Sequence, residues 1–201
     1  MKKNKIILTI VFLATFSIST FAQGGGAWNF TYNMGFPIGE TNDFISKPSF
    51  RGFLIEGRGF VTNNFAVGGS GGWQVFYEDF GWVTEDISET ATIHGYNRKY
   101  INAVPLMATG HFYFFPANLQ PYVGLGVGTY YIETRNYMGI YYVEEDAWHF
   151  GLAPEVGLSI PFGNNSNAGL TVNVKYNWAV KTQKTSGQSW IGLGLGFSYL
   201  F

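Results

Sequence analysis

The end of the chain shows the clearest alternation of large apolar and small side chains. From Ile191 to Phe201, every second residue is large and apolar, and glycine or serine occupies the positions 192, 194, 196 and 198 between them. A period of two over this length predicts a β-strand. From Leu170 to Val180 the pattern recurs with Asn173 and Lys175 among the polar positions. Strands of this kind give a sheet with one apolar and one polar face.

The same two-sided pattern divides the chain into eight segments. Their approximate ranges are 27–36, 50–61, 65–77, 100–115, 121–134, 148–160, 169–180 and 191–201. Most are long enough for a tilted strand to cross a bilayer, which takes about 9 to 11 residues. An open sheet edge in hydrocarbon costs several kcal/mol for each unpaired backbone group. We therefore expect the first strand to pair with the last, which closes a barrel.

The connections alternate between short and long. The short ones, at 62–64, 116–120 and 162–167, are rich in Asn, Pro and Gly, as tight turns require. The long ones, at 37–49, 78–99, 135–146 and 181–188, carry most of the acidic residues. This is typical of an all-β, eight-stranded, antiparallel, up-and-down transmembrane β-barrel with short periplasmic turns and long extracellular loops. The main alternative is a soluble ligand-binding barrel, in which the apolar face would point inward.

The composition and the first residues favour an exported membrane protein. Aromatic residues make up 19% of the chain and charged residues only 12%, where soluble domains have about 25%. Lys2, Lys3 and Lys5 precede an apolar run that ends near Phe21 and Ala22. This predicts a signal peptide over 1–22 and a barrel domain over 23–201, with a short membrane anchor as the alternative.

Charge and cysteine content exclude several classes of function. Beyond residue 22 the chain has nine Lys and Arg against thirteen Asp and Glu, a formal charge of about −4. An acidic exported chain is a poor candidate for binding nucleic acid, so we expect no such partner. The absence of cysteine excludes disulfides and thiolate metal sites.

Several motifs resemble the OmpA/OmpX/OmpW-like outer-membrane β-barrel family over nearly the whole chain beyond residue 22. They are the segments 66–69, 121–128 and 153–157 and the terminal Phe201. Gly196, Tyr199 and Phe201 match the family's C-terminal assembly signal, whereas Gly194 stands where a polar residue is usual. The resemblance implies a place in the bacterial outer membrane, contact with its lipid and lipopolysaccharide, and handling by the barrel assembly machinery. Members of the family have diverse roles, so the resemblance leaves function open.

The polar face predicts a filled lumen with an ion network. Its charged or titratable members are Glu56, Arg58, His111, Glu155 and Lys175, accompanied by Gln74, Thr109, Tyr113, Asn173 and Asn177. Glu155 and Lys175 are nearly equidistant from the centre of the 162–167 turn, so we expect them to form a cross-strand ion pair. Side chains fill an eight-stranded barrel, and charges buried there must be paired. We interpret the network as structural, with gating as the alternative.

The loops carry no recognisable catalytic or metal-binding motif. The acidic groups near 85–89 and 144–146 lack the ligand spacing of a calcium loop. None of the three histidines is followed two positions later by serine, as in the lipid A deacylase type; those positions hold Tyr96, Tyr113 and Gly151. We therefore predict no catalytic residues, metal or cofactor. The aromatic group at 137–142 is either a strand that continues above the membrane or an exposed binding patch.

These observations favour a non-enzymatic outer-membrane barrel that supports envelope integrity or surface interactions through its extracellular loops. The sequence does not identify the partner of the loops. One alternative is a narrow gated pore for small solutes or ions, which requires a continuous water path through the lumen. The second is a lipid-modifying enzyme, which requires His111 or His94 to act with a nucleophile near the outer leaflet.

Overall fold

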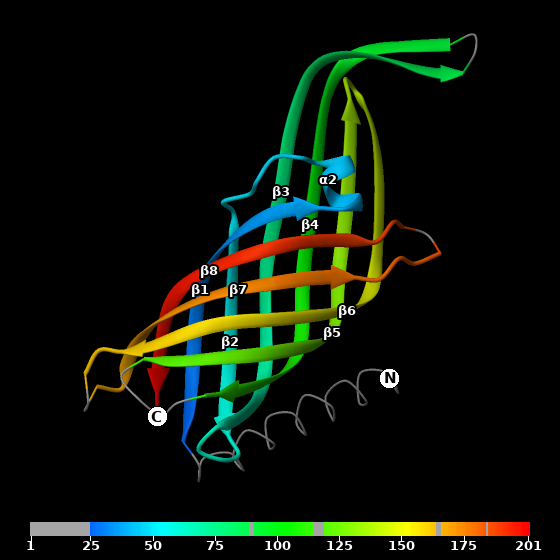
Figure 1. Cartoon of the computed structure of the whole chain (residues 1–201). Coiled ribbons are helices and arrows are strands. Elements are labelled where there is room, and N and C mark those ends of the chain that lie inside the picture. Colours follow the sequence, from blue (N-terminus) through cyan, green and yellow to red (C-terminus); the bar gives the residue numbers. More distant parts are fainter. Residues whose placement is uncertain (1–24, 89–90, 115–118, 164–165, 184) are drawn as a thin grey trace, which may run out of the picture.

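The chain forms one closed barrel of eight antiparallel strands (Figure 1). The computed structural model describes residues 25–88, 91–114, 119–163, 166–183 and 185–201, so the expected signal peptide lies outside the described residues. The elements are β1 (Gly26–Ile38), α2 (Glu40–Phe44), β2 (Gly52–Phe60), β3 (Phe65–Ser88), β4 (Ala91–Tyr113), β5 (Gln120–Met138), β6 (Tyr141–Pro161), β7 (Ala168–Ala179) and β8 (Gln188–Leu200). The predicted up-and-down topology is confirmed.

Each strand pairs with its neighbour in sequence, and β1 pairs with β8 to close the ring. The closing register runs from Ala27 opposite Leu200 to Ile38 opposite Ser189. At the end of this seam the Phe201 N–H donates to Gly26 O at 2.9 Å, and the Gly26 N–H donates to Phe201 O at 2.8 Å. The sheet therefore has no open edge. Within the described ranges, no helix is long and apolar enough to cross a membrane.

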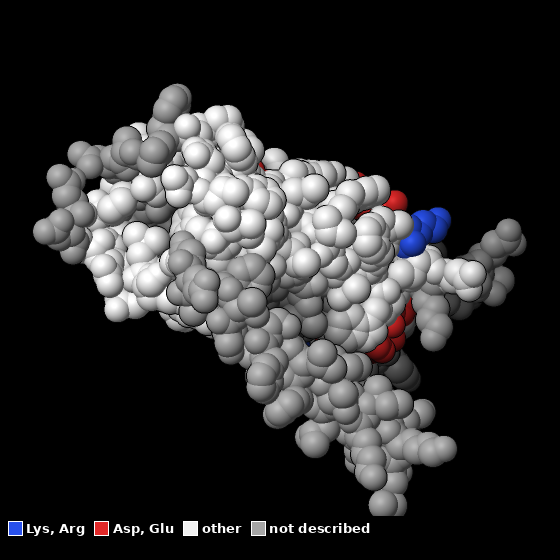
Figure 2. Space-filling view, turned by 90° about the horizontal axis from the view of Figure 1, so that it is seen from below, with Lys and Arg blue, Asp and Glu red and all other residues white. Residues whose placement is uncertain are grey.

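Apolar side chains cover the outside of the barrel and polar side chains fill the inside. Phe197 is 64% exposed, whereas Asn173 and Glu155, on the opposite face of the sheet, are buried. Figure 2 shows almost no charged atoms over the barrel surface in view, and the few visible ones gather at one side. This orientation excludes the soluble alternative, in which the apolar face would be buried. The barrel exterior instead suits contact with lipid hydrocarbon.

Two hairpins continue past the other strands at the end of the barrel opposite the C-terminus (Figure 1). β3 and β4 span 24 and 23 residues, whereas β2 spans 9 and β7 spans 12. The segments 78–99 and 135–146 were expected to be long loops, and this prediction is wrong. Strand pairing continues through them to Ser88 opposite Ala91 and to Met138 opposite Tyr141. These segments combine acidic residues with many aromatic and β-branched ones, which favour strands. The segment 137–142 is thus a continuing strand that turns at Gly139, which has a φ of 61°.

The first long connection folds into the mouth of the barrel. Its helix α2 is anchored by Thr41, whose hydroxyl donates to Gln188 Oε1 at 2.8 Å and accepts the Ser189 N–H at 2.7 Å. Ile45, directly after α2, is fully buried and packs in the core cluster inside the barrel. The Ser46 N–H donates to Glu78 Oε2 at 2.6 Å. This segment therefore caps the lumen at the extracellular end.

Candidate functional site

Glu155 is the centre of the ion network in the lower half of the lumen. Its Oε2 lies 2.9 Å from Lys175 Nζ, and Lys175 is its cross-strand partner in the β6–β7 register. Its Oε1 lies 2.6 Å from His111 Nε2 and 3.2 Å from Arg58 Nη2. The predicted pair of Glu155 and Lys175 is present, and it forms part of a larger network.

Arg58 links this centre to the second carboxylate and to two tyrosines. Its Nη2 lies 2.9 Å from Glu56 Oε2, and its Nη1 donates to the Tyr113 hydroxyl at 2.8 Å. The Arg58 guanidinium carbon also lies 4.5 Å from the ring centroid of Tyr122. The five charged or titratable residues expected on the lumen face thus come together. Tyr122 was missed, although its place in the alternation of β5 put it on the same face.

Three members of the network also have a spacing that suits a metal ion. Single ligand atoms of Glu56, His111 and Glu155 all lie within 4.8 Å of one another, although the sequence predicts no metal site. However, both carboxylates are already paired with Arg58, and Glu155 is paired with Lys175 as well. Two cations on two carboxylates leave little net charge to attract a metal ion. The donor set is better suited to an internal ion network.

Gly124 provides the space that this network occupies, which makes it a sensitive position. A Cβ atom there would lie 2.5 Å from His111 Cδ2 and 2.8 Å from Glu155 Cγ. We expect Gly124→Ala to lower the free energy of unfolding by about 1 to 3 kcal/mol, as overpacking does. Urea unfolding of the refolded barrel in detergent micelles would measure the change. The matched control is Gly69→Ala, where the nearest atom would lie at 3.5 Å and we expect little change.

An aromatic layer separates the ion network from the barrel mouth. Trp190 contacts Phe76 and Tyr130, with ring centroids 5.7 and 5.4 Å apart. Ile101 and Ile132 complete the layer, and all five side chains are buried. This layer, with Ile45 above it, packs the upper lumen with apolar side chains.

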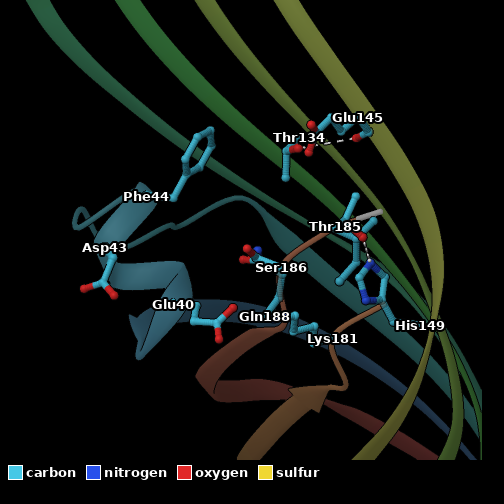
Figure 3. A pocket seen from close by; sticks show the side chains of 11 residues that line it. Glu40, Asp43, Phe44, Thr134, Glu145, His149, Lys181, Thr185, Ser186 and Gln188 are labelled. Atoms are coloured by element: carbon cyan, nitrogen blue, oxygen red, sulfur yellow. Dashed lines mark hydrogen bonds between the residues drawn. The ribbon is translucent and has the colours of Figure 1, made fainter. Parts of the chain in front are cut away.

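A polar pocket of about 410 Å³ lies above this layer, at the mouth (Figure 3). It is enclosed by α2, the adjoining parts of β5 and β6, and the connection from β7 to β8. The residues that line it are Glu40, Asp43, Phe44, Ile132, Thr134, Glu145, His149, Lys181, Thr185, Ser186 and Gln188. This pocket could not be predicted from the sequence, because four separate segments form its walls.

The histidines do not form a recognisable hydrolytic site. His149 Nδ1 bonds Val180 O at 2.8 Å, and the Thr185 hydroxyl lies 3.1 Å from its Nε2. His94 stacks on Trp82, and His111 is held among carboxylates. A nucleophilic triad needs a hydroxyl or thiol, a base and a group that orients the base. In the described part of the chain, no histidine contacts both a hydroxyl nucleophile and a carboxylate in that arrangement.

The C-terminal residues lie where an assembly signal would be accessible. Tyr199 and Phe201 are exposed on the outside of the barrel, and Gly196 faces inward on β8. Phe201 also closes the seam with β1 through its backbone. Their recognition by the assembly machinery stays a prediction.

Comparison with known proteins supports the fold class. No family model and no curated protein matches the chain. Neisserial surface protein A matches with a TM-score of 0.54 and 13% identity, over 88% of this chain and 96% of that chain. The N-terminal β-barrel domain of Pseudomonas aeruginosa OprF matches with a TM-score of 0.50 and 14% identity, over 89% and 98%. The attachment invasion locus protein Ail of Yersinia pestis matches with a TM-score of 0.48 and 16% identity, over 88% and 97%.

The strand order, the apolar exterior and the likenesses to Neisserial surface protein A and to the OprF barrel domain define one class of protein. The chain is a small eight-stranded β-barrel of the kind found in the bacterial outer membrane. At this level of identity the comparisons establish the fold and leave the individual role to the site itself.

Proposed function

We propose that this protein is a non-enzymatic outer-membrane barrel whose projecting hairpins bind the saccharide headgroups of outer-leaflet glycolipid, and so support the envelope. The observation that carries the proposal is an outward-facing pocket of about 310 Å³ on β4 and β5. It is lined by Arg98, Tyr100, Asn102, Arg135 and Tyr137. The packed lumen favours this function over a pore, because the working surface then lies outside the barrel.

The pocket belongs to a continuous aromatic surface on the outer side of the two hairpins. The ring centroids of Tyr77 and Tyr100 lie 4.6 Å apart, those of Tyr100 and Tyr137 5.8 Å, and those of Tyr137 and Tyr142 5.5 Å. At the far end Trp82, 70% exposed, meets the Tyr96 ring edge to face. Rings with an apolar face and a polar edge suit sugars, which have apolar C–H faces and polar hydroxyls.

Charged groups of both signs lie between the rings. Arg98 lies 5.6 Å from the Tyr96 ring, and Arg135 pairs with Glu133 and with Glu144, the latter at 3.0 Å. Such a mixture offers hydrogen-bond donors and acceptors in a small area. Together with the aromatic rings, these groups suit the hydroxyls and C–H faces of a saccharide.

The position of this surface on the barrel places it at the level of the glycolipid headgroups. Tyr131 and Trp148, whose ring centroids lie 5.3 Å apart, sit on the same outer face just below it. Tyrosine and tryptophan on a barrel exterior mark the boundary between hydrocarbon and headgroups. The next layer outward is therefore the headgroup layer, which in the outer leaflet of this membrane consists of saccharides.

The hairpin is held rigid at its β-bulge. The Asp79 carboxylate accepts the Tyr96 hydroxyl at 2.7 Å, the Gly81 N–H at 2.9 Å and the Tyr77 hydroxyl at 3.2 Å. The hydrogen bond from Tyr96, supported by the other two, holds the pKa of Asp79 below its ordinary value of 3.8. Asp79 is therefore ionised at neutral pH and keeps both aromatic rings in place. A preformed surface loses less entropy on binding.

The proposal predicts that the outward tyrosines are required for glycolipid binding. We expect the double variant Tyr100→Ala and Tyr137→Ala to weaken binding at least about ten-fold, because each ring contact contributes about 0.5 to 1.5 kcal/mol. Isothermal titration of the nanodisc-embedded barrel with deacylated, water-soluble lipopolysaccharide would measure this. Tyr141→Ala is the matched control. Tyr141 is also exposed, but it lies on the face of β6 opposite to Tyr142 and the outward aromatic surface.

Two results would contradict the proposal. One is the absence of binding by the unmodified barrel. The other is equal affinity in the double tyrosine variant and in Tyr141→Ala, which would show that the aromatic surface is not the contact.

A further inference from the structure

The pocket at the barrel mouth has an excess of carboxylates without partners. Glu40 and Asp43 reach it from α2, and Glu145 reaches it from β6. None of these three carboxylates has a hydrogen bond or ion pair with another described residue. Lys181 is the only cationic side chain of Lys or Arg type among the described lining residues. A pocket with this charge attracts a cation.

The carboxylates lie on separate walls of the pocket. Figure 3 shows Glu40 and Lys181 on one side and Glu145 with Thr134 on the other. Among the described residues, the group whose ligand atoms come close enough for one metal ion is Glu56, His111 and Glu155, deep in the lumen. The mouth carboxylates are not part of such a group. Their separation suits an extended organic cation better than a single metal ion.

Gln188 supplies a hydrogen-bond donor at the base of the pocket, independently of the carboxylates. Its side chain is only 5% exposed, and its Oε1 accepts the Thr41 hydroxyl at 2.8 Å. Within the described chain its amide nitrogen has no hydrogen-bond partner, although the residue lines the pocket. This nitrogen is not among the fully buried side-chain atoms, so its N–H groups are accessible from the pocket. An oxygen atom of a bound molecule would satisfy it.

We propose that the mouth pocket binds a small polyhydroxylated organic cation of the amino-sugar type. The ammonium group lies against a carboxylate of one wall, where charge-assisted hydrogen bonds are strongest, and a carboxylate of the facing wall accepts from a sugar hydroxyl. The sugar hydroxyls accept from the Gln188 amide and bond the hydroxyls of Ser186 and Thr134, which also line the pocket. The volume of about 410 Å³ is in the range of small-molecule sites.

The packing below the pocket makes this a binding site and not a transit point. Ile132 lies at its inner wall, and the layer of Phe76, Tyr130 and Trp190 follows beneath. A charged ligand would have to cross this apolar layer to reach the polar network, at a large desolvation cost. The apolar layer therefore separates the pocket from the ion network. The pocket lies on the inner side of the hairpins, apart from the outward aromatic surface.

The test compares two sugars that differ in one group. Glucosamine carries an ammonium where glucose carries a hydroxyl, so the pair isolates recognition of charge. We expect isothermal titration of the nanodisc-embedded barrel at low salt to give at least about ten-fold tighter binding of glucosamine than of glucose. In nuclear magnetic resonance spectra, the side-chain amide signals of Gln188 should shift as glucosamine is added.

Variants locate the binding to this pocket. The double variant Glu40→Gln and Glu145→Gln should weaken glucosamine binding at least about ten-fold and bring it close to that of glucose. Asp146→Asn is the control, because it removes the same charge one residue further along β6, on the other face of the strand. We expect its affinity to equal that of the unmodified protein.

Three outcomes would overturn the inference. They are equal binding of the two sugars, no binding of glucosamine, and unchanged binding in the double variant. The two proposals can fail separately. The double variant Tyr100→Ala and Tyr137→Ala tests the outward aromatic surface, whereas Glu40→Gln and Glu145→Gln test the mouth pocket.

Discussion

Replacing Glu155 with glutamine is expected to lower the free energy of unfolding by about 3 to 5 kcal/mol. The Glu155 carboxylate holds Lys175, His111 and Arg58 at 2.9, 2.6 and 3.2 Å, and its side chain is almost wholly buried. The amide removes the negative charge and leaves two cations with one buried carboxylate, Glu56, to balance them. Urea unfolding in micelles, followed by tryptophan fluorescence, measures the loss.

An exposed ion pair on the same protein provides the control for Glu155. Glu144 pairs with Arg135 at 3.0 Å, but both side chains are more than a third exposed. Exposed pairs contribute about 0 to 1 kcal/mol, so Glu144→Gln should have little effect. Equal losses for the two variants would show that the lumen network does not stabilise the barrel.

Replacing Trp190 with alanine is expected to cost about 3 to 5 kcal/mol as well, for a different reason. Trp190 is 3% exposed and packs against Phe76 and Tyr130 across the lumen. Alanine leaves a cavity that the rigid barrel wall cannot fill. Circular dichroism in a urea series measures the change without relying on the tryptophan that is removed.

Trp178 is the matched control for this substitution. It lies on the outside of β7, 43% exposed, where it faces lipid or detergent. Lipid chains rearrange around alanine at that position, so the loss should be much smaller than for Trp190. A comparable loss at both positions would contradict the packed aromatic layer.

The barrel could be predicted from the sequence because one physical constraint acts along the whole chain. In hydrocarbon every backbone group must pair within the sheet, so each strand shows the same two-residue period. The same period shows which residues face the lumen. The centre of the turn at 162–167 determines which residues of β6 and β7 lie opposite each other. For these reasons Glu155 and Lys175 could be placed opposite each other without a structure.

The mouth of the barrel could not be predicted, because it depends on contacts distant in sequence. Thr41 bonds Gln188 across 147 positions, and no local pattern indicates that pairing. The hairpin arms at 78–99 and 135–146 were expected to be long connections, which carry most of the acidic residues, among them Asp79, Glu144 and Glu145. In the structure these residues alternate with aromatic neighbours on strands that lie outside the hydrocarbon, where charge carries no penalty.

The central claim is that the lumen is packed and that the protein acts through its outer surface. Single-channel conductance of the refolded barrel in a planar bilayer tests it most directly. We expect no stable current steps from barrels shown to be folded and inserted. Stable steps that change in Glu155→Gln or Lys175→Met would contradict it, because they would show a water path through the ion network.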